Sequence, residues 1–318
     1  MLGSISHTPG APPKRDRFLL LNHLFCIVFA GIKTGIFITE AANGSTVSFT
    51  YGITYMPFAH SFDDTPLWYD VRGNGGGEPV LLIAGNGCDH SVWNAVIAEF
   101  TPDRTVIIYD HRGTGKSGNN LTGTWSTRDF ARDALEVLLE AGFGRAHVYG
   151  HSMGGRVAQW LASDKPAAIK SLVLGATSVG EKRGIPRTPE ATKAMRENDS
   201  VALRNMCYPE WWSSENPEQA ERGEPRPHDM EAFLCHLRAS TDHDSWEIAS
   251  SICSPTLVIH GNEDGITPAG NAEILAARIP AAQLLIVDKA RHVYWAGRPE
   301  VHQKVSTFFS NAEKGRFG

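Results

Sequence analysis

Gly150-His151-Ser152-Met153-Gly154 is the stretch that decides the fold, because it lies between an apolar run and a segment with helical spacing. The run at 146–149 predicts a buried strand, and residues 152–163 predict a helix. A G-x-S-x-G motif in this context is typical of a sharp turn that projects the serine hydroxyl away from the sheet. Its glycines are needed because side chains there would collide with the neighbouring strand and helix.

Strand-like and helix-like segments alternate on both sides of this turn. Apolar runs that predict further strands occupy residues 67–71, 79–84, 105–109, 169–174, 256–260 and 283–287. Helical spacing of apolar residues is found at 91–100, 127–141, 269–278 and 299–309. Strands separated by helices of this length predict an α/β protein with a mostly parallel, doubly wound sheet built from right-handed βαβ units.

The alternation stops at about residues 178–251, which are rich in Pro, Glu, Arg and Trp. No strand-like run occurs there, and helices are predicted at 188–197 and 229–239. This segment is interpreted as an inserted helical cap.

Composition narrows the class of protein. The chain has 318 residues, a formal net charge of −5 and 42% hydrophobic residues, which is the profile of a globular domain. No basic excess supports nucleic-acid binding. The five cysteines include no C-x-x-C pair and predict thiols in a reducing compartment, with one disulfide in a secreted protein as the alternative: Cys26, Cys88, Cys207, Cys235 and Cys253.

Residues 1–55 are predicted to be a leader, with the working domain at 56–318. Lys14, Arg15 and Arg17 precede an apolar run at 18–32, which is too short to predict a stable membrane span. Two interpretations stay open. Residues 1–30 could act as a signal peptide of a secreted protein, or the stretch could be an extension before a true start at Met56 in a cytoplasmic protein.

Further motifs resemble segments of the α/β-hydrolase superfamily. Residues 110–117 resemble its D-x-R-G-x-G-x-S loop, interpreted here as structural, and they lack the first glycine of a phosphate-binding G-x-x-x-x-G-K-S loop. Residues 84–87 resemble the H-G-x-G segment, although Ala84 replaces the histidine. The resemblance implies that the backbone N–H groups of Asn86 and Met153 form an oxyanion hole.

The resemblance also supplies partners for Ser152. Residues 261–268 resemble the G-x-x-D-x-x-x-P loop, which implies Asp264 as the acid, with Glu263 as the fallback. Residues 290–292 resemble the A-G-H segment, which implies His292 as the base, although Arg291 replaces the glycine. The chain order Ser, Asp, His is that of the fold.

The implied function is a serine hydrolase that cleaves a small carboxylic ester or lactone through an acyl-enzyme, with no metal or organic cofactor. The length of the cap and residues 242–246 are most similar to enol-lactonases and methylesterases. A carbon–carbon bond hydrolase, a cofactor-free haloperoxidase-like activity and a hydrolase-derived ligand-binding protein are the alternatives. Trp93, Trp211 and Trp212 are predicted to face the substrate pocket, with simple packing as the competing interpretation. The oligomeric state is left open.

Overall fold

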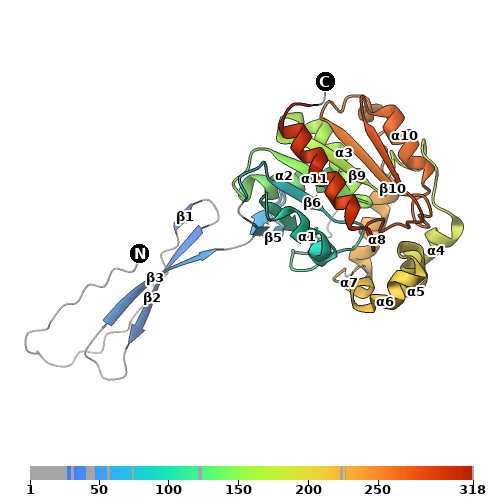
Figure 1. The fold of residues 1–318 in the computed structure, drawn as a ribbon. Coiled ribbons are helices and arrows are strands. Elements are labelled where there is room, and N and C mark those ends of the chain that lie inside the picture. The colour runs from blue at the N-terminus through green and yellow to red at the C-terminus, as the bar shows by residue number, and fades with distance from the viewer. Residues whose placement is uncertain are drawn as a thin grey trace, which may run out of the picture. The chain divides into compact units, whose positions relative to one another are not determined.

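The computed structural model describes residues 27–29, 32–40, 47–55, 58–73, 75–120, 124–222, 225 and 227–316. The chain divides into two compact units, Met1–Pro57 and Phe58–Gly318. Each unit is built around its own sheet (Figure 1).

The first unit is a small antiparallel sheet in which β2 lies between β1 and β3. Its strands are β1 (Ile27–Phe29), β2 (Ile32–Glu40) and β3 (Val47–Tyr55). No helix or strand was predicted within residues 1–55. Residues 47–55 nevertheless alternate apolar and small polar residues with the period of a strand. Lys14, Arg15, Arg17 and Met56 lie outside the described residues, so the leader at 1–55 stays a prediction.

The second unit contains an eight-stranded sheet with the order β11-β10-β9-β8-β6-β7-β5-β4. The strands from β6 to β11 pair in parallel, whereas β5 pairs antiparallel with both β7 and β4. This topology confirms the predicted doubly wound sheet. The strand bounds are β4 Phe58–His60, β5 Pro66–Arg72, β6 Val80–Ile83, β7 Val106–Tyr109, β8 Ala146–His151, β9 Ile169–Gly175, β10 Thr256–Gly261 and β11 Gln283–Val287.

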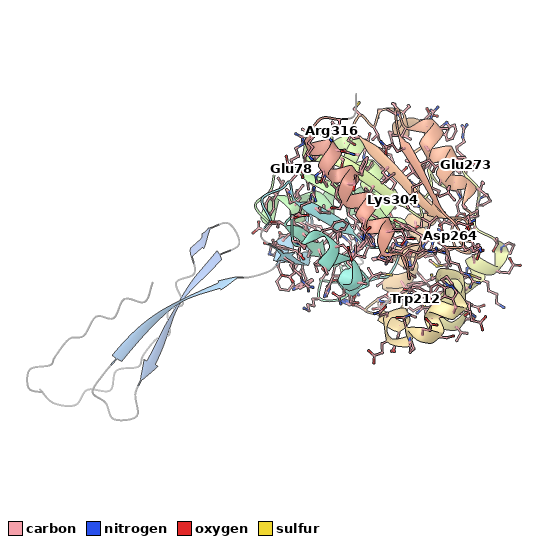
Figure 2. All side chains as sticks on the ribbon, viewed as in Figure 1. Glu78, Trp212, Asp264, Glu273, Lys304 and Arg316 are labelled. Atoms are coloured by element: carbon pink, nitrogen blue, oxygen red, sulfur yellow. The ribbon has the colours of Figure 1, made fainter. Side chains whose placement is uncertain are left out.

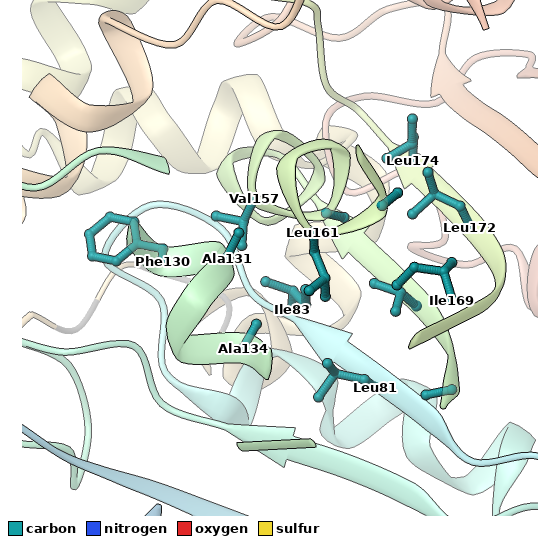
Figure 3. Close-up of a cluster of buried hydrophobic side chains, with 14 of the residues drawn as sticks. Leu81, Ile83, Phe130, Ala131, Ala134, Val157, Leu161, Ile169, Leu172 and Leu174 are labelled. Atoms are coloured by element: carbon teal, nitrogen blue, oxygen red, sulfur yellow. The ribbon is translucent and has the colours of Figure 1, made fainter. Parts of the chain in front are cut away.

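Helices cover both faces of this sheet because its central strands are apolar on both sides. In β6, Leu81 and Ile83 face one cluster, and Val80 and Leu82 face the other. The first cluster contains α2 (Thr127–Glu140), α3 (Met153–Asp164) and α10 (Gly270–Arg278), and Figure 3 shows α2 and α3 side chains against the strands. The second contains α1 (Asn94–Phe100), α11 (Pro299–Glu313) and the single turn η1 (His90–Trp93). A further single turn, η2 (Pro166–Ala168), packs on the first cluster through Ala168.

The inserted cap lies between β9 and β10, at one end of the sheet (Figure 1). Its helices are α4 (Pro189–Glu197), α5 (Ser200–Cys207), α6 (Glu210–Glu215), α7 (Pro217–Arg222), α8 (Met230–Thr241) and α9 (Trp246–Ala249). Thr188, Asp199 and Asp229 each cap a helix by accepting a backbone N–H. The two predicted cap helices correspond to α4 and α8. The others are too short to show a periodic pattern.

Two further features concern long helices and cysteine pairing. No helix within the described ranges is long and apolar enough to cross a membrane. The four cysteines that the structure describes, Cys88, Cys207, Cys235 and Cys253, form no disulfide, and Cys26 lies outside the described residues.

Candidate active site

Ser152 occupies the sharp turn between β8 and α3. Its backbone has φ 58° and ψ −119°, a conformation that costs a non-glycine residue about 1–3 kcal/mol. Two hydrogen bonds hold it, because the Ser152 N–H donates to the Gly175 carbonyl at 2.8 Å and the Thr177 hydroxyl donates to the Ser152 carbonyl at 2.8 Å. A Cβ on Gly154 would collide with the Ile83 carbonyl, so glycine is required for this close approach.

Asp264 follows β10 and has a fully buried carboxylate. The N–H groups of Ile266 and Thr267 donate to its Oδ1 at 2.8 and 2.9 Å. Its Oδ2 lies 2.8 Å from Nδ1 of His292 and 2.9 Å from Nε2 of His260. Burial alone would raise the pKa of Asp264, but His292 and the hydrogen bonds from both histidines hold that pKa far below its ordinary value. The carboxylate therefore stays charged.

His292 lies in the loop after β11, and its ring is almost completely buried. The contact between Nδ1 and Asp264 places the ring proton on Nδ1 and leaves Nε2 as the basic nitrogen. His151 supports this loop, because its Nε2 donates to the His292 carbonyl at 3.1 Å. Burial, and next the neighbouring His292, lower the pKa of His151 to about 3, so His151 is neutral at ordinary pH.

His260 was not expected at this site. Its Nε2 lies 2.9 Å from both the Asp264 carboxylate and the Thr267 carbonyl, so Nε2 carries the proton and donates to both oxygens. The sequence offers one clue, which is that His260 stands four residues before Asp264 at the end of an apolar run. The acid is thus held by two imidazoles and two backbone amides.

The loop at residues 84–87 follows β6 and lies beside the serine. A Cβ on Gly85 would approach Ser152 Cβ at 3.3 Å. Asn86 is buried, and both polar atoms of its side-chain amide lack a hydrogen-bond partner among the described residues. Met153 is the first residue of α3, where backbone N–H groups have no acceptor within the helix. Asn86 and the start of α3 thus both lie beside Ser152.

Two buried histidines fix the ends of this loop. His111 lies 3.1 Å from the Ala84 carbonyl through Nε2. The Gly87 N–H donates to Nδ1 of His236 at 3.2 Å, and Nε2 of His236 donates to the Arg112 carbonyl at 2.8 Å. Burial is the main cause that lowers the pKa of His111 to about 3 and that of His236 to about 4. Since His236 belongs to α8, the cap is joined directly to the loop.

A small chamber of about 50 Å³ opens beside the serine. Residues from four loops of the sheet and from the cap line it: Gly85, Asn86, Cys88, Val92, His151, Ser152, Met195, Leu203, Cys207, Pro225, Ile266, His292 and Val293. Asp264 lies at the end of the sheet that faces the cap (Figure 2). The structure thus brings Ser152, His292 and Asn86 to one chamber, with Asp264 directly behind His292. Glu263 is exposed and makes no such contact with the histidine.

The three tryptophans predicted for the pocket do not line this chamber. Trp93 is fully buried in the core, where it stacks on Trp295 with ring centroids 5.7 Å apart. The single turn η1 ends at Trp93 and directs this side chain into the second core cluster. The sequence pattern does not reveal this direction. Trp211 is 52% exposed. Trp212 lies in the cap (Figure 2) and lines a larger neighbouring hollow.

Cys88 is a second nucleophilic side chain in the lining. Burial, and next the nearby Asp89, raise the pKa of its thiol to about 12. Since the thiolate is the reactive form, Cys88 is inert at neutral pH. Within the described ranges, no group of three histidine, cysteine or carboxylate side chains could hold a metal ion.

Comparisons with known proteins agree with this architecture. A family profile described as "alpha/beta hydrolase fold" matches residues 78–206, and one described as "TAP-like protein" matches residues 229–316. A protein of Azorhizobium caulinodans, named provisionally as the carbamate hydrolase RutD, is 31% identical over 260 residues, which are 79% of this chain and 96% of that protein.

Two solved structures are also similar. One is Est816, described as an N-acyl homoserine lactone degrading enzyme, with a TM-score of 0.70 and 26% identity over 79% of this chain and all of that one. The other is the enol-lactonase of Burkholderia xenovorans LB400, with a TM-score of 0.70 and 24% identity over 80% of this chain and all of that one. At 24% identity, the second likeness concerns the fold alone.

Proposed function

Because the chain belongs to the α/β-hydrolase family, we propose that it cleaves a carboxylic ester or lactone through an acyl-enzyme formed on Ser152. One observation carries the proposal. Ser152 on its strained turn and His292 line the same small chamber, and Nδ1 of His292 lies 2.8 Å from the buried carboxylate of Asp264. A serine, a base and an orienting acid in this relation are what nucleophilic catalysis at a carbonyl needs.

In the proposed reaction, the Ser152 hydroxyl attacks the carbonyl carbon while Nε2 of His292 takes its proton. The Asp264 carboxylate holds the imidazole in the required tautomer and stabilises the imidazolium. His292 then gives the proton to the leaving alkoxide, and the ester C–O bond breaks. Water, deprotonated by His292, hydrolyses the acyl-enzyme and releases the acid.

The developing oxyanion needs donors that are already in place. The backbone N–H groups of Asn86 and Met153 are proposed for this role. The position of Asn86 in the chamber lining and the place of Met153 at the start of α3 support the assignment. The unpaired side-chain amide of Asn86 is a further donor close to the same space. Cys88 does not compete as nucleophile, because its thiol stays protonated.

Hydrolysis of a carbamate is a second candidate, and the provisional name of the 31% identical relative favours it. A carbamate presents the same electrophilic carbonyl to Ser152, so the proposed residues keep their roles. Carbon–carbon bond hydrolysis and haloperoxidase-like perhydrolysis would use the same side chains.

The test is labelling with a fluorophosphonate, followed by peptide mass mapping and a panel of short esters, lactones and carbamates. We expect the label on Ser152, and turnover of at least one short ester or lactone. Asp264→Asn should label far more slowly, because His292 would lose its orienting acid. A folded protein that takes no label on Ser152 would contradict the proposal and favour a ligand-binding role.

A further inference from the structure

We propose that the substrate site has two chambers, and that the second accepts a long apolar arm of the ester. This inference rests on the proposed function at Ser152. The first chamber of about 50 Å³ is far smaller than the range of about 300–1,000 Å³ that is typical of ligand pockets. It has room for the reacting carbonyl group and little else.

A larger hollow of about 410 Å³ lies next to the first chamber. Val92 and Val293 line both spaces, so they form the wall between them. The same three stretches of chain contribute to both linings. Cys88 faces the first chamber and Ala95 the second, and Cys207 and Tyr208 divide in the same way. The two spaces are therefore neighbouring parts of one cleft between cap and sheet.

Aromatic and aliphatic side chains form much of the wall of the larger chamber, together with polar residues such as Asn94 and Gln219. Trp212 of α6 stacks on Tyr208 with ring centroids 4.9 Å apart and an interplanar angle of 14°. On the opposite side, Trp295 follows His292 by three residues and stacks on the buried Trp93. Aromatic faces of this kind contact apolar or aromatic ligand groups well.

The charged residues at this chamber do not form an anion site. The Arg298 guanidinium donates to the Asp288 carbonyl at 2.9 Å, and Glu99 is an exposed carboxylate on α1. Glu99 and Arg298 carry opposite charges, so the described lining offers no net charge to an ionic arm. The walls thus favour an uncharged aliphatic or aryl arm, of six or more carbon atoms, attached to the ester whose carbonyl reaches Ser152.

The wall must yield for such an arm to pass. Val92 is half-buried, and Val293 is next to His292. Both are small aliphatic side chains, and Val92, the less buried of the two, opens the passage by a change of rotamer. Each methylene that leaves water for the second chamber raises kcat/KM by at most about fourfold.

The test compares two substitutions on α1. Ala95→Trp fills the second chamber, whereas Ala98→Trp adds the same bulk at an exposed position of the same helix that lines neither chamber. The readout is the ratio of kcat/KM for p-nitrophenyl octanoate to that for p-nitrophenyl acetate. We expect Ala95→Trp to lower this ratio at least tenfold and Ala98→Trp to change it less than twofold.

A third variant tests the wall between the two chambers. Val92→Ala should raise the same ratio severalfold, because it widens the passage between the chambers. Equal ratios in the wild type and all three variants would overturn the two-chamber proposal while leaving hydrolysis at Ser152 intact. A wild-type protein that neither turns over the acetate nor takes a fluorophosphonate label would instead contradict the proposed function.

Discussion

The two walls of the chamber beside Ser152 are held in different ways. The sheet wall carries Ser152 and His292, and directional hydrogen bonds fix it, including four to the Asp264 carboxylate. The cap wall is mainly apolar and consists of Met195, Leu203, Cys207 and Pro225. Hydrogen bonds fix atoms within a few tenths of an ångström, whereas apolar packing tolerates exchange of similar side chains. The sheet wall is thus suited to chemistry, and the cap wall to changes of substrate.

The largest expected effect belongs to the sheet wall. Ser152→Ala removes the nucleophile, and we expect ester turnover to fall about 10⁴-fold or more. The melting temperature should stay within a few degrees, because the hydrogen bonds described for this turn use the backbone N–H and carbonyl of Ser152, which alanine keeps. Steady-state kinetics and calorimetry check both statements. If this variant retains activity, then Ser152 is not the nucleophile and the sheet wall does not carry the chemistry.

The acid comes next. Asp264→Asn keeps the shape of the side chain, but its amide nitrogen would face the N–H donors of His260 and His292. We expect kcat to fall about 10³- to 10⁴-fold. Glu263→Gln is the matched control, since Glu263 is exposed and one residue away, and kcat should change less than twofold. Similar losses in both variants would show that the assignment of the acid is wrong.

A smaller effect is expected where the walls meet, at His236. His236→Gln can still reach the Arg112 carbonyl but cannot accept the Gly87 N–H as Nδ1 does, so the loop at 84–87 should shift. We expect kcat to fall about 10- to 100-fold with little change in KM. Affinity for a boronic acid inhibitor, which mimics the tetrahedral intermediate, should fall in parallel.

His236→Asn is the conservative comparison, because its carbonyl oxygen lies close to the position of Nδ1 and can accept the Gly87 N–H. It should retain more kcat than His236→Gln. If both variants lose kcat equally and in proportion to a loss of melting temperature, then the cap histidine supports the fold and does not position the loop.

Low pH should reduce the free energy of unfolding through buried histidines on both walls. Burial lowers the pKa of His111 and His151 to about 3 and that of His236 to about 4, below the usual value near 6.5 that applies in the unfolded chain. Between about pH 6.5 and 4 the unfolded chain binds more protons, so the free energy of unfolding falls as the pH is lowered through this window. Urea midpoints at pH 7.5, 6 and 5 should decrease in that order.

His302 tests this acid effect outside the chamber beside Ser152, because it lines the larger hollow. It is buried, neither ring nitrogen has a partner among the described residues, and burial lowers its pKa to about 4. His302→Leu should reduce the loss of unfolding free energy between pH 7.5 and 5 by about 1–2 kcal/mol. If the free energy of unfolding depends on pH in the same way in the variant and the wild type, this account is wrong.

The same contrast explains what could be predicted from the sequence. Ser152, Asp264 and His292 were predicted because each stands in a short motif after a strand, and parallel strands bring their carboxyl ends to one edge. The contact of His260 with the acid could not be predicted, because it depends on how the loop after β10 folds back. Trp93 was predicted for the pocket, but the turn before α1 directs it into the core.

The cap was less predictable for a physical reason. Helices of four to eight residues, such as α9 and α5, show no complete apolar period. The placement of the longer cap helix α8 also depends on contacts with the rest of the molecule, because its Phe233 packs on Gly87. A Cβ on Gly87 would lie 2.7 Å from that ring, so the cap and the loop must be shaped together.

The positions of the site residues along the chain also determine when each is synthesised. Ser152 leaves the ribosome long before His292, and the loop that carries His292 follows β11, the strand at the edge of the sheet. A domain generally folds as a unit, so the sheet is not complete before its edge strand has been made. On the proposed function, the growing chain therefore lacks its base and cannot form an acyl-enzyme until the last strand has joined the sheet.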